Sequence, residues 1–334
     1  SAGKRVLIVI DDPWDPTHEP ALGCVDESTA SVVFVTTRLR GLIKGAAEVE
    51  LDTLSRDEAL SLLLRAGDLP APTVERPAPP DAFEAVELCG RLPLCIQVAG
   101  AMIQEHADDW EEWLVPALKQ SHEGAELRES VEKRVLRASL QSIKAADRAG
   151  VTALFDFCAV FNEDVTIPAA VFDAIALDVV ADARAAEFLA AASSRSPSKP
   201  PSTLGSSTPL AQPDSAPDTQ PAPSLSVAST IVRRWLREAL RHSLLLGSIA
   251  TGVKQHDLVR DFSLARAAKR AGGLRAMHMR MLNALVARMP AGGFANLVVC
   301  SEAERGAELS FYVGQQLPHH LAGAFDDAVP MGES

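Results

Sequence analysis

An unbroken run of β-branched and aliphatic residues at positions 6–10 ends in two consecutive aspartates, Asp11 and Asp12. Such a run, without the alternation of a half-exposed strand, is typical of a strand buried on both faces of a parallel sheet. A second run of the same character covers residues 31–38. The two runs predict neighbouring strands of an α/β sheet, and residues 47–51 are expected to add a third, short strand.

The pattern turns helical at Ser55. Ser55 and Glu58 have the spacing of a capping box, in which each side chain bonds the other residue's backbone N–H. Pro93 is expected in the first turn of a helix over 94–105, where its missing N–H costs nothing. Residues 53–125 are therefore predicted to form a small helical domain.

The rest of the chain is also predicted to be mainly helical. Helices are expected at 127–144, 148–159, 168–177, 232–242 and 258–270, with a β-hairpin at 243–255. Helices followed by a hairpin are the outline of a winged helix, which assigns residues 126–271 to one domain. Within it, proline and serine crowd residues 193–226, which predicts a disordered insertion. Residues 272–334 are expected to form a helical tail.

The composition argues against several functional classes, among them nucleic-acid-binding and membrane proteins. The 334 residues carry a net charge of −12, so a general affinity for nucleic acid is not expected. No apolar run approaches the length of a membrane span, and no membrane partner is expected. The five cysteines are scattered and odd in number, which favours reduced thiols and a cytoplasmic location. No spacing typical of a metal site or a catalytic triad is visible. Trp110 and Trp113 are assigned to the core, and His319 and His320 to a helix surface.

Four residues lie at positions where they could bind a ligand or take part in catalysis. Asp11 and Asp12 follow a predicted parallel strand at its carboxyl end, the edge at which ligands bind in open α/β sheets. Arg38 ends the neighbouring run, where a guanidinium can sense a phosphate. His256 precedes a predicted helix and can donate to an anion there. Structural roles remain open for each: a turn or cap for the aspartates, an exposed arginine, and a solvated His256 beside a capping Asp257.

Five segments in a fixed order carry a family resemblance. They are residues 4–15, 33–38, 49–60, 89–94 and 255–261. These segments resemble the Walker B, sensor-1, helical "L-x-x-L", GLPL and MHD motifs of NB-ARC domains. NB-ARC domains are a branch of the STAND nucleotide switches, which include plant disease-resistance proteins and the apoptotic protease-activating factor. Arg91 replaces the usual glycine of the GLPL motif, and Gln255 replaces the methionine of the MHD motif.

The resemblance implies a fold and a site. Residues 1–52 would be the C-terminal part of a P-loop NTPase-type α/β domain, followed by the helical domain, the winged helix and the tail. Asp11 would hold Mg²⁺ and Asp12 would serve catalysis of hydrolysis. Arg38, Pro93 and His256 would contact the γ-phosphate, the adenine and the β-phosphate of ATP or ADP.

The resemblance also implies a molecular switch. ADP would keep the protein closed, and exchange for ATP would open it for self-association, with slow ATP hydrolysis at most. No G-x-x-x-x-G-K-[ST] motif occurs in the sequence, so weak nucleotide binding is expected. The chain is thus either a fragment or a relative that lacks the P-loop. Upstream effector and downstream repeat domains are expected to be missing.

Two other classes remain open. One is an AAA+-type ATPase with a winged helix acting on DNA, against which the GLPL-like and MHD-like segments count. The other is a winged-helix transcription regulator. In that class Arg233, Arg234, Arg237 and Arg241, which lie partly on one helix face, would face DNA.

Overall fold

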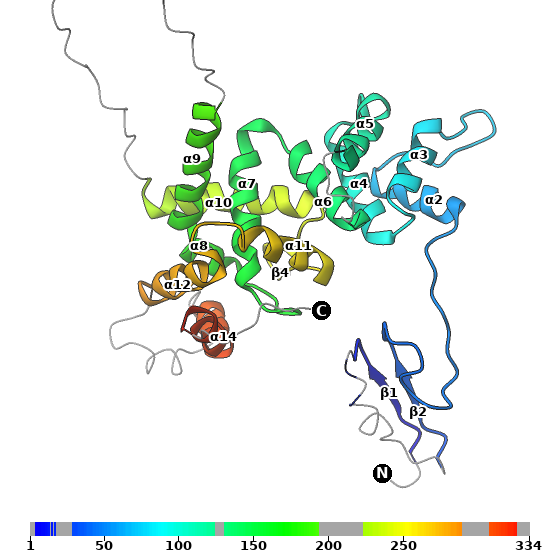
Figure 1. Ribbon diagram of the computed structural model, residues 1–334, viewed down its shortest axis with the longest axis horizontal. Helices are drawn as coiled ribbons and strands as arrows, with labels where there is room; N and C mark the ends of the chain where they lie inside the picture. Colours follow the sequence, from blue (N-terminus) through cyan, green and yellow to red (C-terminus); the bar gives the residue numbers. More distant parts are fainter. Residues whose placement is uncertain are drawn as a thin grey trace, which may run out of the picture. The chain divides into compact units, whose positions relative to one another are not determined.

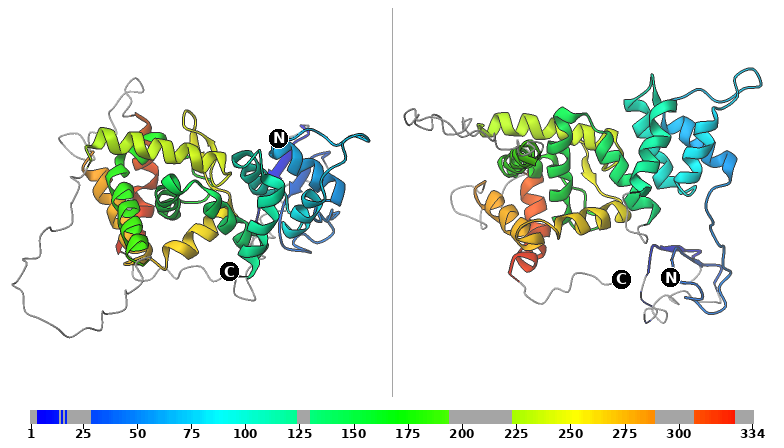
Figure 2. Two further views of the ribbon diagram at one scale, coloured as in Figure 1. Left: turned by 90° about the horizontal axis from the view of Figure 1, so that it is seen from above. Right: turned by 45° about the horizontal axis from the view of Figure 1, so that its top comes forward.

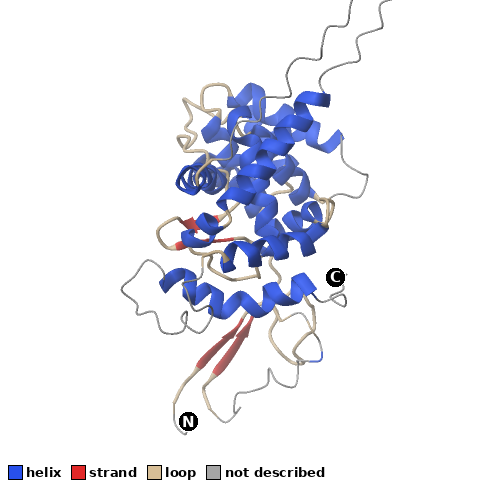
Figure 3. Ribbon diagram, turned by 90° about the vertical axis from the view of Figure 1, so that its left-hand side faces the viewer, coloured by secondary structure: helices blue, strands red, loops and turns tan. Residues whose placement is uncertain are grey.

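The computed structural model describes residues 4–13, 15, 17, 29–123, 130–193, 223–288 and 307–325. The chain divides into two compact units, residues 1–52 and 53–334. Helices dominate the described residues, and the strands are few and short (Figure 3). None of the described helices is long and apolar enough to cross a bilayer.

The first unit contains a two-stranded parallel sheet of β1 (Leu7–Ile10) and β2 (Val32–Val35). Leu7 lies opposite Val32, and the parallel pairing agrees with the prediction. The predicted burial on both faces is wrong for the described chain, because Leu7 and Val32 are 66% and 58% exposed. A two-stranded sheet leaves its side chains open to solvent unless another element covers a face.

The predicted third strand is absent from this unit. Residues 46–55 are described without strand pairing, and Val49 and Leu51 are 84% and 91% exposed. Apolar composition alone does not make a strand, because the backbone groups also need the edge of a neighbouring strand.

The second unit begins with four helices: α2 (Arg56–Ala66), α3 (Pro80–Leu88), α4 (Pro93–Glu105) and α5 (Trp110–Glu123). The predicted capping box is confirmed: the Ser55 N–H donates to Glu58 at 3.0 Å, and the Glu58 N–H donates to Ser55 at 3.3 Å. Pro93 is the first residue of α4, as expected. Eight of the thirteen residues of α4 are buried, and the helix packs against α2 and α6.

The next elements are helices, with one β-hairpin between the last two of them. They are α6 (Val131–Ser142), α7 (Ala145–Phe157), η2 (Cys158–Val160), α8 (Ala169–Ala174), α9 (Ala176–Ser193), α10 (Leu225–Arg241), β3 (Leu246–Ser248), β4 (Gly252–Lys254) and α11 (Asp257–Ala267). The predicted hairpin is confirmed as the antiparallel pair β3–β4. Ile167 adds an antiparallel bridge to Val253, with N–H donors at 2.7 and 3.0 Å. Most of the predicted insertion, residues 194–222, lies outside the described residues, and α10 already begins at Leu225.

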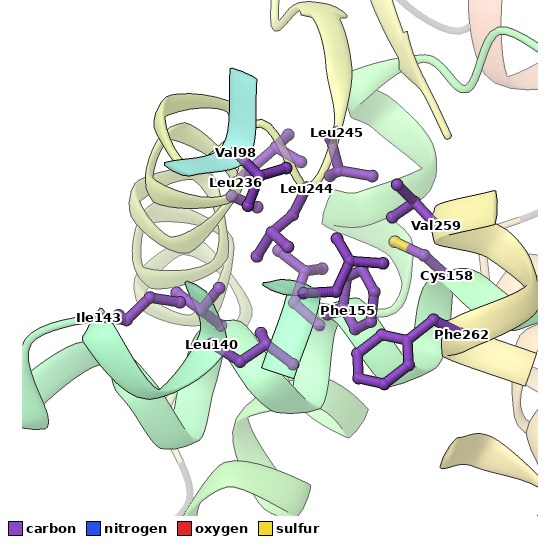
Figure 4. Packing of buried hydrophobic residues seen from close by; sticks show 14 of the residues in the cluster. Val98, Leu140, Ile143, Phe155, Cys158, Leu236, Leu244, Leu245, Val259 and Phe262 are labelled. Carbon is purple, nitrogen blue, oxygen red and sulfur yellow. The ribbon is translucent and has the colours of Figure 1, made fainter. Parts of the chain in front are cut away.

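One apolar core runs through this unit. Phe155 of α7 and Phe262 of α11 pack at a ring-centroid distance of 6.0 Å, and Leu236 of α10 lies in the same cluster (Figure 4). The α7–α10 contact depends on Gly150, since a Cβ there would lie 1.9 Å from the Trp235 ring. Glycine is therefore required where the indole crosses α7.

Helices α12 (Gly273–Val286) and α14 (Ala307–Phe325) complete the described chain and lie side by side (Figures 1 and 2). Arg275 of α12 donates to the Ala324 carbonyl of α14 at 3.0 Å. Asn162, which follows η2, donates to Gln316 of α14 at 3.0 Å. Polar contacts from two different segments thus hold α14 in place.

Candidate functional site

The carboxyl ends of β1 and β2 form a connected polar group. Thr36 follows β2, and its hydroxyl donates to the Asp11 carboxylate and accepts the Asp12 N–H at 3.1 Å. The Arg38 guanidinium donates to the Asp12 carboxylate at 3.1 Å. Parallel pairing places both strand ends at one edge, so residues 24 to 26 positions apart in sequence meet here.

Asp12 holds an unusual backbone conformation in this group. Its φ of 46° lies in the left-handed region, which non-glycine residues rarely adopt and which aspartate tolerates better than most. The turn redirects the chain after Asp11, so the two consecutive carboxylates engage Thr36 and Arg38 separately. The Asp12 and Arg38 side chains are 43% and 66% exposed, so their ion pair contributes at most about 1 kcal/mol to stability. Both remain accessible to a ligand.

Pro93 is exposed at the start of α4, beyond a tight turn. Gly90 and Arg91 both have positive φ, 61° and 54°. Arg91 therefore occupies a conformation that glycine adopts at lower cost. The Arg91 carbonyl accepts the Leu54 N–H at 3.1 Å, which ties this turn to the segment before α2.

His256 is the N-cap of α11, so the expectation that Asp257 caps this helix is wrong. The His256 Nδ1 accepts the Leu258 N–H at 3.3 Å, which leaves the proton of a neutral imidazole on Nε2. The cap thus presents an Nε2–H donor beside the helix N-terminus. Before it, the side chain of Gln255 is buried; its amide donates to Ser263 at 3.5 Å, and its Oε1 has no partner among the described residues.

The structure brings together three of the five predicted site residues: Asp11, Asp12 and Arg38 lie in one polar group of the first unit. Pro93 and His256 lie in the second unit, at the first turns of α4 and α11. The convergence of all five on one nucleotide stays a prediction.

The sequence analysis did not predict a cluster of buried histidines. His320, assigned to a helix surface, is fully buried, and His319 is half-buried, so that assignment is wrong. Tyr312 bonds His320 Nε2 at 2.7 Å, and His278 of α12 faces His320. Burial lowers the pKa of His278 to about 4 and that of His320 to about 3. The available signal was weak: Tyr312 and His320 are eight residues apart, which places them on one helix face.

Three of the four arginines of α10 that the sequence analysis named are paired within the second unit, and Arg237 is exposed. Arg233 forms a bidentate ion pair with Asp173, in which two guanidinium nitrogens lie 2.9 and 2.5 Å from the two carboxylate oxygens. Arg234 lies 2.6 Å from Asp147, and Arg241 lies 3.1 Å from Glu238. These pairs reduce the positive charge that α10 could offer to a phosphate backbone.

A mostly helical chain with a small parallel sheet that ends in two acids and an arginine resembles the NB-ARC class, and comparison with curated proteins supports this at the level of the class. The chain is 28% identical to disease resistance protein ADR1 of Arabidopsis thaliana over 171 residues, 49% of this chain and 20% of that protein. It is 30% identical to the disease resistance RPP13-like protein 3 of the same plant over 119 residues, 33% of this chain and 14% of that protein.

A bacterial relative is also similar. Regulatory protein AfsR of Streptomyces griseus is 33% identical over 102 residues, 30% of this chain and 10% of that protein. No protein-family model matches the chain. In each of these comparisons, the chain spans a fifth or less of the relative's length.

Proposed function

We propose that this chain is part of an ADP- and ATP-binding switch of the NB-ARC type that acts in signalling. The observation that carries the proposal is the strand-end group, in which Thr36 bonds Asp11 and Asp12, and Arg38 pairs with Asp12. Similarity to two plant disease-resistance proteins and a bacterial regulator supports the same class.

The strand-end residues suit magnesium and phosphate. Asp11 is exposed and accepts one hydrogen bond from Thr36, and its second oxygen, which has no hydrogen-bond donor among the described residues, would bind a hydrated Mg²⁺. Asp12 would orient the attacking water. Arg38 would exchange its 3.1 Å contact with Asp12 for the γ-phosphate, a change that only ATP can offer. This exchange would give ATP and ADP different free energies of binding, which any nucleotide switch requires.

The second unit would supply the adenine and diphosphate contacts. Pro93 is exposed and rigid, as a surface that packs on a base must be. His256 offers its Nε2–H as a donor for an anion, beside the positive end of the α11 dipole. In this proposal residues 53–125 are the small helical domain, and residues 126–271 are a winged helix that clamps ADP. Opening would then permit self-association.

The test measures bound nucleotide on the complete gene product that contains this sequence, because these 334 residues do not include a P-loop motif. The purified protein is denatured, and the released nucleotide is quantified by anion exchange. We expect about one ADP per chain. Protein without bound nucleotide, and without measurable affinity for ADP or ATP, would refute the proposal.

Substitutions assign the contacts. We expect Arg38→Ala to weaken ATP binding at least about tenfold, as the loss of a charged hydrogen bond implies, and to leave ADP binding unchanged. Arg40→Ala is the matched control, because Arg40 is an exposed arginine of the same unit that pairs with Glu50. Equal effects of the two variants would remove Arg38 from the site.

His256 needs two variants because it also caps α11. His256→Asn keeps a side-chain acceptor for the Leu258 N–H, whereas His256→Ala removes it. We expect ADP retention to fall in both. Retention restored by asparagine would mean that His256 acts only as a cap. Tight, salt-sensitive DNA binding without nucleotide would favour the transcription-regulator class instead.

A further inference from the structure

Three histidines converge where α12 and α14 pack against η2. His278 comes from α12, and His319 and His320 come from α14. One nitrogen from each ring can be chosen so that all three lie within 4.8 Å of one another. Residues 41 and 42 positions apart in sequence thus share one small volume.

The spacing of the rings matches a tetrahedral metal site. The three ring-centroid distances are 5.1, 5.3 and 5.3 Å. With Zn–N bonds of about 2.05 Å, tetrahedral geometry places ring centroids about 5.2 Å apart and ligating nitrogens about 3.3 Å apart. The Nδ1 atoms of His278 and His320 lie 3.1 Å apart, close to that separation. Two facing Nδ1 atoms can be bridged either by one proton or by one metal ion.

The outer nitrogens of His319 and His320 are held as metal-binding imidazoles require. His319 Nε2 lies 2.9 Å from the Val160 carbonyl, which can only accept, so the lone pair of a neutral His319 is on Nδ1. The Tyr312 hydroxyl lies 2.7 Å from His320 Nε2 and can accept its proton, which leaves His320 Nδ1 as the ligand atom. Oxygen acceptors of this kind fix the tautomer and the orientation of ligating histidines.

The surrounding residues leave room for this arrangement. A Cβ at position 323 would lie 2.5 Å from His278 Nε2, so Gly323 allows the α12 imidazole to approach α14. The Phe161 ring meets His320 edge-on at 6.4 Å. The nearby positive charge of Arg260 is paired with Glu163 at 3.2 Å.

We propose that His278, His319 and His320 bind a divalent transition-metal ion, with Zn²⁺ as the natural occupant, and that the ion fastens α14 to α12. Three imidazoles suit Zn²⁺ and leave a fourth position for water. The second cluster of potential ligands differs: Lys144 lies 2.7 Å from Glu105, and Arg241 pairs with Glu238. Side-chain cations already compensate those carboxylates, so the histidine cluster is the metal site.

The test uses the 334-residue chain freed of metal by a chelator. Co²⁺ is added first, because its visible absorption reports tetrahedral nitrogen ligands, and Zn²⁺ is then used to displace it. We expect one equivalent of either ion to bind and Zn²⁺ to raise the melting temperature. A chain that remains folded and binds neither ion saturably would overturn the proposal.

Variants test the ligand set. His319 is half-buried, so His319→Gln is expected to fold, as circular dichroism would check, and to lower Zn²⁺ affinity at least about tenfold. His278→Gln is expected to do the same. His106→Gln is the matched control, a partly buried imidazole stacked on Trp113 at 4.1 Å. Unchanged Zn²⁺ binding in both His319→Gln and His278→Gln would exclude this site.

Tyr312 is expected to act as a positioning residue. Tyr312→Phe removes the oxygen that orients His320, so we expect Zn²⁺ affinity to fall about tenfold while the stoichiometry stays at one. A phenylalanine variant that binds Zn²⁺ as tightly as the parent would remove Tyr312 from this role. None of these outcomes depends on nucleotide binding.

Discussion

His242 is the clearest case of a single buried group whose surroundings set its charge. It is the C-cap of α10 and is 1% exposed, and its Nδ1 has no partner among the described residues. Burial lowers its pKa to about 4; Arg241, His106 and Lys144 act in the same direction, and Glu105 opposes them. The imidazole is therefore neutral near pH 7.

We expect His242 to make the protein less stable in acid. Its pKa is depressed below the unfolded value of about 6.5, so the unfolded chain binds the proton first as the pH falls. The stabilising effect of the neutral ring is complete above pH 6.5 and is lost progressively toward pH 4. The slope from one such group is at most about 1.4 kcal/mol per pH unit.

Denaturant unfolding of the parent and of His242→Gln at pH 7, 6 and 5 measures this effect. The glutamine variant should lose less free energy of unfolding between pH 7 and pH 5 than the parent, because it has one titrating group fewer. Parallel pH dependence in the two proteins would contradict the assignment. Glu238, which faces His242 together with Glu105, is left unchanged in both.

Sequence reasoning succeeded at residues whose partners are local. Ser55 bonds Glu58 three positions away, and Pro93 needs only its own fixed φ and missing N–H. It failed at His320, because the residues that bury it come from α12 and from the turn after η2. It also chose Asp257 rather than His256 as a cap, since aspartate is the commoner N-cap residue.

Helices were easier to predict than strands for a related reason. The bonds of α2 and α4 are internal to each helix, so periodicity and caps suffice. A strand needs a partner elsewhere in the chain, and residues 47–51 have none among the described residues. The proximity of Asp12 and Arg38 was predicted because parallel pairing brings both strand ends to one edge, and their role in a site stays a prediction. The salt bridge between them depends on the left-handed backbone of Asp12, which the sequence does not reveal.

Gly150 decides how closely α7 and α10 approach. An alanine in a helix normally gains up to about 1 kcal/mol over glycine. Here its Cβ would lie 1.9 Å from the Trp235 ring, whose Nε1 is held by Asp147 at 3.1 Å. Overpacking of this kind costs about 1–3 kcal/mol, so we expect Gly150→Ala to destabilise the protein overall.

Gly314→Ala is the matched control for this prediction, because nothing lies within 4 Å of a Cβ at that position of α14. It should be neutral or stabilising by up to about 1 kcal/mol. Urea unfolding of the two variants and the parent makes the comparison. A Gly150→Ala variant as stable as the parent would show that the indole can move aside.

At the scale of the whole molecule, stability is concentrated in the second unit. Among the described residues, every buried apolar residue except Pro13 and Leu42 lies after residue 52. Charged groups add long-range links there: buried Asp156 pairs with Arg266 and Arg270, each at 2.7 Å. Buried networks of this kind join α7 to α11 more specifically than apolar packing alone.

We therefore expect removal of residues 1–52 to leave the second unit folded. The melting temperature of residues 53–334, followed by far-UV circular dichroism, should lie within about 2 °C of that of the full chain, because less than about 1 kcal/mol is lost. A large fall in melting temperature, or loss of a cooperative transition, would show that the first unit stabilises the second.

The position of α14 sets a practical limit on how far the protein can be shortened from its other end. Tyr312 and His320 contact Phe161 and His278. Ending the chain before residue 307 would remove α14 and expose the buried imidazole of His278 and the buried ring of Phe161 to water. The exposed apolar surface would make the shortened protein prone to aggregate. A protein expressed for study should therefore end after Phe325.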